Sequence, residues 1–242
     1  MEFFDSYSRR ARLYPAILGA APAFALATIA VPWNQLGAPQ VIVALGVGVL
    51  LFSFADIARR FGLRAERRMF ASTGGRPFPT VFRHRDATLD TKSKDRYLKF
   101  LGQRLEEKAP SQVDEEFNPA AADAFYVRCG NWLRPRTRDK AKFRLLFEEN
   151  VTYGFRRNLY GLKMFCIFLN FAVIFACFLF FGLAREEHSL WLLFGVFVFA
   201  ILHALYFLFA VTKKSVLDAS NQYGRELALS CEVLMDDKPH NA

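Results

Sequence analysis

The sequence has few cysteines and no pattern that pairs them. Four occur in 242 residues, without the spacing of a disulfide framework and without a C-x-x-C motif. They are Cys129, Cys166, Cys177 and Cys231. The composition is also too apolar for intrinsic disorder and has no collagen-like repeat. A small secreted domain held together by disulfides is therefore excluded.

The motifs that accompany common enzyme chemistry are missing too. The Gly74-Gly75 pair is not followed by a Walker lysine, and there is no dinucleotide fingerprint, no Gly-x-Ser-x-Gly and no His-Glu-x-x-His. The histidines are widely dispersed, at His84, His188, His203 and His240. Neighbouring acids such as Glu148 and Glu149 fit solvated helix faces better than acid and base pairs. We therefore expect no catalytic residues, no metal site and no cofactor.

Apolar and basic residues are abundant instead. The chain is 53% hydrophobic and 16% aromatic, with 27 phenylalanines, and it carries a formal net charge of +9. The apolar share exceeds that of an ordinary globular domain. This combination predicts a protein that is partly in a membrane and partly in the cytosol.

Four apolar runs approach or exceed the length that crosses a bilayer, which needs about 20 residues of helix. They cover residues 13–33, 39–54, 164–184 and 190–212. Only a few residues separate the first run from the second and the third from the fourth. The sequence therefore predicts two transmembrane hairpins, with a polar segment of about one hundred residues between them.

Basic residues near the ends of the runs predict the orientation. Arginines and lysines cluster before the first run, after the second, before the third and after the fourth, whereas the two short connections hold Arg185 alone. Both termini and the central segment are therefore expected in the cytoplasm. The predicted organisation is a first transmembrane hairpin (1–58), a basic cytosolic helical domain (59–160), a second transmembrane hairpin (161–212), and a C-terminal amphipathic helix and tail (213–242).

The fold class follows as an all-α membrane protein with four transmembrane helices in two hairpins and an inserted cytosolic helical domain. Within that domain, apolar spacing predicts helices over about 91–108, from Pro119 with Asn118 as N-cap, and from about Thr137 onward. Phenylalanines on several faces of the last two spans favour contact with lipid and with other subunits. A homo-oligomer is therefore expected.

Two polar residues lie inside the predicted spans, Asn170 and His203. Each is sixteen or seventeen residues from Glu187, near the centre of the second connection, so they should lie at the same depth. An unpaired amide or imidazole in hydrocarbon is costly, and the two side chains could therefore form a hydrogen bond. The pair is either a static clamp between helices or a polar constriction in a pore built by several subunits.

Basic residues also cluster in the central segment, where the run from Arg134 to Lys142 is predicted to surround a helix start. Such a position favours anions, including a nucleotide or phosphate. A solvated basic loop attracted to anionic lipid headgroups is the alternative, and no motif for double-stranded nucleic acid accompanies the charge. The candidate binding residues are Arg134, Arg136, Arg138, Lys140, Lys142, Arg156 and Arg157.

The segment Leu145–Asn158 (LLFEENVTYGFRRN), which leads into the third run, resembles a group of uncharacterised bacterial membrane proteins with the same two-plus-two layout. Small four-span proteins of this kind are similar in architecture to membrane effectors of bacterial anti-phage systems. The resemblance implies an oligomer in the bacterial inner membrane whose cytosolic domain senses a nucleotide or protein ligand and damages the membrane, for example by forming a pore. The alternative is a membrane anchor or scaffold that recruits a soluble partner.

Overall fold

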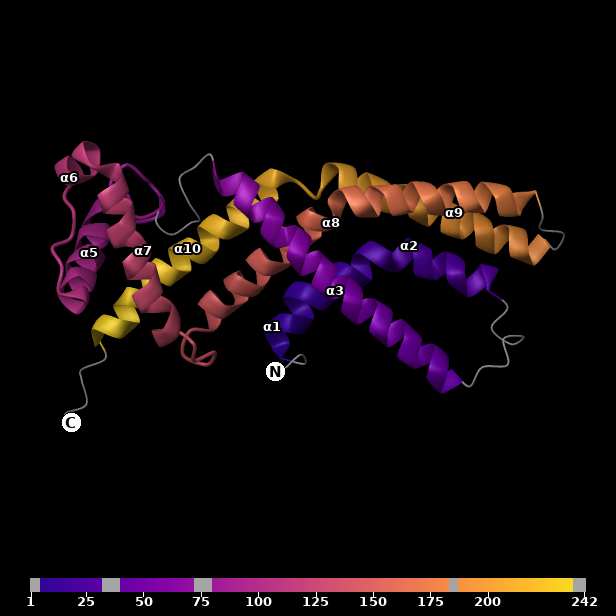
Figure 1. Cartoon of the computed structure of the whole chain (residues 1–242), viewed down its shortest axis with the longest axis horizontal. Helices are drawn as coiled ribbons and strands as arrows, with labels where there is room; N and C mark the ends of the chain where they lie inside the picture. Colours follow the sequence, from indigo (N-terminus) through magenta and orange to yellow (C-terminus); the bar gives the residue numbers. More distant parts are fainter. Residues whose placement is uncertain (1–4, 32–39, 72–79, 183–186, 237–242) are drawn as a thin grey trace. The chain divides into compact units, whose positions relative to one another are not determined.

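The structure is a computed structural model that describes residues 5–31, 40–71, 80–182 and 187–236. Within these ranges 86% of the residues are helical and there is no strand. The chain divides into two compact units (Figure 1). The span unit comprises Met1–Arg67 and Gly154–Val216, and the helical unit comprises Arg68–Tyr153 and Leu217–Ala242.

The span unit contains the helices that are long and apolar enough to cross a membrane, and the described ranges hold four of them. The first is α1 (Ser6–Ser8), a π-helical turn (Arg9–Leu13) and α2 (Tyr14–Ala30) in succession. The others are α3 (Gln40–Ala71), α8 (Arg144–Phe181) and α9 (Glu187–Phe209). The predicted helical fold with four candidate spans is therefore confirmed. The predicted connection around residues 34–38 and the first two residues of the one at 185–189 lie outside the described residues.

Apolar clusters hold the four helices of the span unit together. In one cluster Ala58 of α3 meets Leu162 and Cys166 of α8 and Phe207 of α9. A second cluster joins α2, α8 and α9. The exposed phenylalanines point away from these clusters, as expected for side chains that face lipid. They include Phe165, Phe168, Phe171, Phe175, Phe178, Phe194 and Phe209.

Helices α3 and α8 touch backbone to backbone at a pair of glycines. A Cβ on Gly161 would lie 2.3 Å from the backbone nitrogen of Gly62, so neither residue could carry a larger side chain without separating the helices. Gly46 and Gly48, by contrast, have open space beside them. The two glycines in contact, Gly62 and Gly161, lie just outside the apolar runs 39–54 and 164–184.

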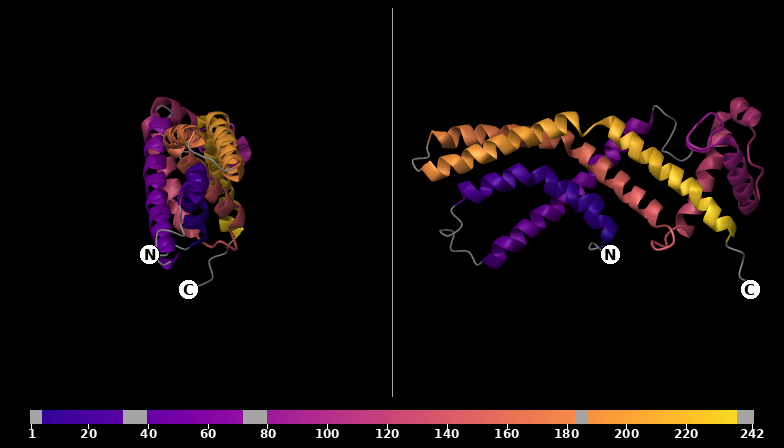
Figure 2. Two further views of the ribbon diagram at one scale, coloured as in Figure 1. Left: turned by 90° about the vertical axis from the view of Figure 1, so that its right-hand side faces the viewer. Right: turned by 180° about the vertical axis from the view of Figure 1, so that it is seen from behind.

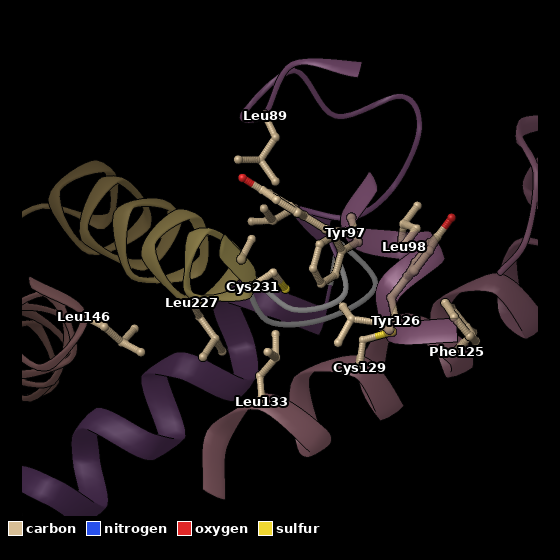
Figure 3. Close-up of a cluster of buried hydrophobic side chains, with 14 of the residues drawn as sticks. Leu89, Tyr97, Leu98, Phe125, Tyr126, Cys129, Leu133, Leu146, Leu227 and Cys231 are labelled. Carbon is tan, nitrogen blue, oxygen red and sulfur yellow. The ribbon is translucent and has the colours of Figure 1, made fainter. Parts of the chain in front are cut away.

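The helical unit is built from α5 (Thr91–Leu105), α6 (Gln112–Phe117), α7 (Pro119–Arg136), the first turns of α8 and most of α10 (Lys213–Asp236). Figure 3 shows its core, where Tyr97, Tyr126, Cys129, Leu133 and Leu227 gather from α5, α7 and α10. All five are at most 1% exposed. A single apolar centre therefore joins α10 to helices more than eighty residues earlier in the chain.

Most helix ends in this unit agree with the sequence analysis. The side chain of Asn118 accepts from the backbone N–H of Ala121 and caps α7, as predicted. Helix α6 was not predicted, although Ser111 and Asp114 form a capping box at its start. The helix expected from Thr137 begins only at Arg144, because α7 continues through Pro135 to Arg136 and a turn follows.

Candidate functional site

The two polar residues of the predicted spans lie against each other. The Nδ2 atom of Asn170 on α8 is 3.0 Å from Nδ1 of His203 on α9, and the two side chains belong to residues that are 1% and 5% exposed. Asn170 also donates from Nδ2 to the carbonyl of Cys166, at 2.7 Å. The matched depth inferred from sequence therefore corresponds to a direct hydrogen bond.

His203 reaches a third helix through its other ring nitrogen. Its Nε2 atom is 2.8 Å from the carbonyl oxygen of Leu18 in α2. A carbonyl can only accept, so Nε2 carries the proton and Nδ1 of the neutral ring accepts from Asn170. Pro22 lies four residues after Leu18 and has no N–H to donate to that carbonyl. His203 thus supplies the donor that the proline removes.

The same arrangement occurs seven residues earlier in the first helix. Pro15 has no N–H for the carbonyl of Ala11, and Nδ2 of Asn158 on α8 donates to that carbonyl at 2.7 Å. Asn158 is fully buried, beside the crossing of α3 and α8 at Gly62. We call Asn158, Asn170 and His203 the polar clamp. Asn158 and His203 bind the proline-containing first helix to α8 and α9 through backbone carbonyls, and Asn170 joins His203 to α8.

An ion pair lies beside the clamp. Arg157 donates from Nη1 to Oε2 of Glu66 on α3 at 3.1 Å, and the two side chains are 12% and 3% exposed. Arg157 was a candidate for binding an external anion, but here it faces a carboxylate of its own chain. Arg156, its neighbour, is exposed. The structure therefore separates these two arginines, which the sequence analysis had grouped.

Lys163 on α8 caps the C-terminal end of α9. Its Nζ atom donates to the carbonyls of Leu208 and Val211, at 3.0 and 2.9 Å. These carbonyls lie where α9 ends at Phe209, and carbonyls of a last helical turn have no donor within the helix. The lysine that the sequence placed before the third span therefore caps the fourth.

The basic run of the helical unit lies around the end of α7, and the expected position at a helix start is wrong for its first members. Arg134 and Arg136 occupy the last turn of α7, where cations favour the helix dipole. Arg138, Lys140 and Lys142 are exposed in the turn before α8. The expectation failed because Pro135, which looks like a helix breaker, is accommodated inside α7.

The backbone donors of this turn already have an anion of the chain itself. The carboxylate of Asp139 accepts from the N–H groups of Ala141 and Lys142, at 2.8 and 3.2 Å. Three of the cations lie over aromatic rings, among them Lys142, whose Nζ is 5.8 Å from the centre of the Phe143 ring. The Arg136 guanidinium lies 4.0 Å from the centre of the Trp132 ring, and Nζ of Lys140 lies 5.0 Å from that of Phe147. The turn thus exposes cations, whereas the backbone N–H groups of Ala141 and Lys142 are already bonded to Asp139.

A buried polar network holds the segment before α5 against α6 and α7, and no sequence motif indicated it. Arg83 donates to Asp123 from Nε and Nη2, at 2.8 and 2.6 Å, and this ion pair raises the arginine pKa. Glu115 accepts from the hydroxyl of Tyr126 at 2.8 Å, and burial raises the tyrosine pKa. Lys94 donates to the carbonyls of Arg83 and Asp86, and burial lowers the lysine pKa.

These buried groups make hydrogen bonds to one another and to backbone carbonyls. A shallow groove of about 750 Å³ lies on the helical unit, between α5 and the segment 106–112. Its lining mixes acids and bases, including His84, Asp95 and Lys99. Across the described ranges no three His, Cys, Asp or Glu side chains come close enough to hold a metal ion.

Comparison of the chain with protein-family models, with curated proteins and with solved structures found no match.

Proposed function

We propose that this protein is a multi-pass membrane anchor and scaffold, in which the spans hold the helical unit at the bilayer for contacts with other proteins. The observation that carries the proposal is the polar clamp. Asn158, Asn170 and His203 spend their hydrogen bonds on carbonyls and side chains of the same chain. A residue that lines an ion path needs polar atoms directed at the path. The hydrogen bonds within the chain give the clamp residues a sufficient structural role without an ion path.

The helical unit supports the binding part of the proposal. Its core is apolar and continuous, its buried Arg83 is paired with Asp123, and the turn that follows α7 exposes Arg138, Lys140 and Lys142. Exposed cations at one place favour an acidic protein partner. We propose that the protein lies in the bacterial inner membrane with both termini and the helical unit in the cytoplasm, and reporter fusions at Gly75, Glu187 and the C-terminus test that topology.

The hypothesis of a pore-forming anti-phage effector, which came from the resemblance in architecture, predicts a different outcome. Vesicles that contain the purified protein and a self-quenched dye separate the two. If the protein is an anchor, the dye stays inside the vesicles and the potassium gradient persists. Gramicidin is the positive control for loss of the potassium gradient. A pore releases dye or dissipates a potassium gradient, and His203→Leu should then stop the flux while the protein still inserts.

Recruitment is measured by purifying the full chain under mild detergent and identifying proteins that copurify in stoichiometric amounts. A variant with Arg138→Gln, Lys140→Gln and Lys142→Gln should lose the partner. The matched control removes two exposed cations elsewhere, Lys213→Gln and Lys214→Gln, and should keep it. Flux through the wild-type protein would contradict the proposal. Equal recovery of the partner with the wild type and with the triple Gln variant would contradict it as well.

A further inference from the structure

Two places on the helical unit expose large apolar side chains to an unusual degree. Phe117 and Val113 on α6 are 92% and 71% exposed, and Leu145 in the first turn of α8 is 67% exposed. The other large apolar residues described in this unit are 40% exposed or less. Exposed aromatic and aliphatic side chains of this kind commonly mark a contact with a partner.

Charges of opposite sign surround the two places. On α6 the exposed carboxylates of Asp114 and Glu116 accompany Val113 and Phe117, and these four residues form the acidic patch. The capping box at Ser111 fixes α6 and therefore the position of the patch. It also explains how a helix of only six residues can present a defined surface.

The second place, around Leu145, is complementary to the acidic patch in charge. Leu145 is accompanied by exposed cations on the turn and on the first residue of α8, and we call this group the basic patch. Its members are Arg138, Lys140, Lys142, Arg144 and Leu145. Each patch thus has an apolar centre and a charged rim, which is the anatomy of a protein interface.

The patches lie at opposite ends of α7. Helix α6 ends just before Asn118, the N-cap of α7, and the basic turn follows Arg136, at which α7 ends. Eighteen helical residues separate them, which is about 27 Å at 1.5 Å per residue. Figures 1 and 2 show α6 and the turn at the two ends of this helix. One chain therefore cannot bring its own two patches together without breaking α7.

We propose that the acidic patch of one chain binds the basic patch of a second copy, head to tail. Symmetric pairing of either patch with itself would place like charges opposite one another, which is unfavourable. A head-to-tail contact leaves one patch free at each end, so it either closes a ring or continues as a filament. The inference rests on the proposed scaffold role and names the partner of its basic turn.

Two variants that each lack one patch test the inference in the full chain in detergent. The acid-end variant carries Glu116→Lys and Phe117→Ser, and the base-end variant carries Lys140→Glu and Leu145→Ser. Asp114 is kept because its carboxylate caps α6. The control variant carries Arg225→Glu, an exposed charge reversal on α10 outside both patches.

Mass photometry over a range of concentrations gives the readout. Wild type and the Arg225→Glu control should form dimers and larger species. Each patch variant alone should associate at least tenfold more weakly. An equimolar mixture of the two variants should regain dimers and stop there, because one intact acidic patch then meets one intact basic patch.

Assemblies of wild-type size in both patch variants would overturn the inference and would attribute association to the spans. Failure of the mixture to recover dimers would overturn it as well. If the full chain does not associate but an acidic soluble protein binds the basic turn, the inference is wrong while the proposed scaffold function stands. Circular dichroism of each variant confirms that the helical content is retained.

Discussion

The prolines of the first helix make a quantitative prediction about His203. In His203→Leu, the carbonyl of Leu18 loses its donor, and Asn170 loses its partner on α9. Leaving a buried polar group unsatisfied costs about 1–3 kcal/mol, although hydrogen bonds between membrane helices average about 0.6 kcal/mol. We therefore expect the free energy of unfolding to fall by about 2 kcal/mol.

The decisive comparison is His203→Leu in the wild-type chain against His203→Leu in a chain that also carries Pro22→Ala. An alanine at position 22 has an N–H that can donate to Leu18 within the helix, so the carbonyl no longer depends on His203. The cost of His203→Leu should then fall by about 1 kcal/mol, which is the typical net value of one hydrogen bond. Pro15→Ala is the matched control, because the carbonyl that it serves belongs to Ala11 and its partner is Asn158.

The assay is reversible unfolding in mixed micelles, driven by dodecyl sulfate and followed by far-UV circular dichroism. Four variants form the double-mutant cycle at positions 22 and 203, and two more provide the control cycle with position 15. A coupling of about 1 kcal/mol with Pro22→Ala and none with Pro15→Ala supports the argument. Equal costs of His203→Leu in all three backgrounds would refute it.

Three further predictions concern other parts of the chain. Asn158→Leu should lower the unfolding free energy by about 1–3 kcal/mol, less so in Pro15→Ala, in the same micelle assay. Gly161→Ala should reduce folded protein sharply, because a Cβ there meets the backbone of α3, whereas Gly46→Ala has open space and should be neutral by gel filtration. Burial raises the pKa of Cys129 to about 12. Above about pH 9 the unfolded thiol therefore ionises first, and stability should fall by about 1.4 kcal/mol per pH unit, relative to Cys129→Ala, in urea titrations.

Features carried by neighbouring residues could be predicted from sequence. The apolar runs gave the candidate spans, because a bilayer imposes a length that a single segment must satisfy. Asn118 followed by Pro119 gave the start of α7, because a cap needs only its own first turn. The capping box at Ser111 was an equally local signal for α6 and was overlooked in a short acidic segment.

Features carried by distant residues could not be predicted. The contact of Gly62 with Gly161 depends on the crossing of α3 and α8, which no local pattern specifies. Likewise, Arg157 resembled a free cation until Glu66, ninety-one residues earlier, was found beside it. The continuation of α7 through Pro135 has a related cause, since packing of Leu133 and Trp132 on the core keeps α7 helical through a residue with poor helix propensity.

The polar clamp combines a local feature, the prolines of the first helix, with distant residues on α8 and α9. It shows how a polar residue inside a span can be interpreted. Pro15 and Pro22 lack the N–H groups that would reach the carbonyls four residues earlier, at Ala11 and Leu18. The first helix therefore requires two external donors. Asn158 on α8 and His203 on α9 supply them. Because an unpaired carbonyl is nearly as costly in hydrocarbon as an unpaired side chain, a proline in one span is itself a reason for a polar residue in another. A buried polar residue in a span thus indicates an ion path only after the carbonyls freed by prolines have been assigned their donors.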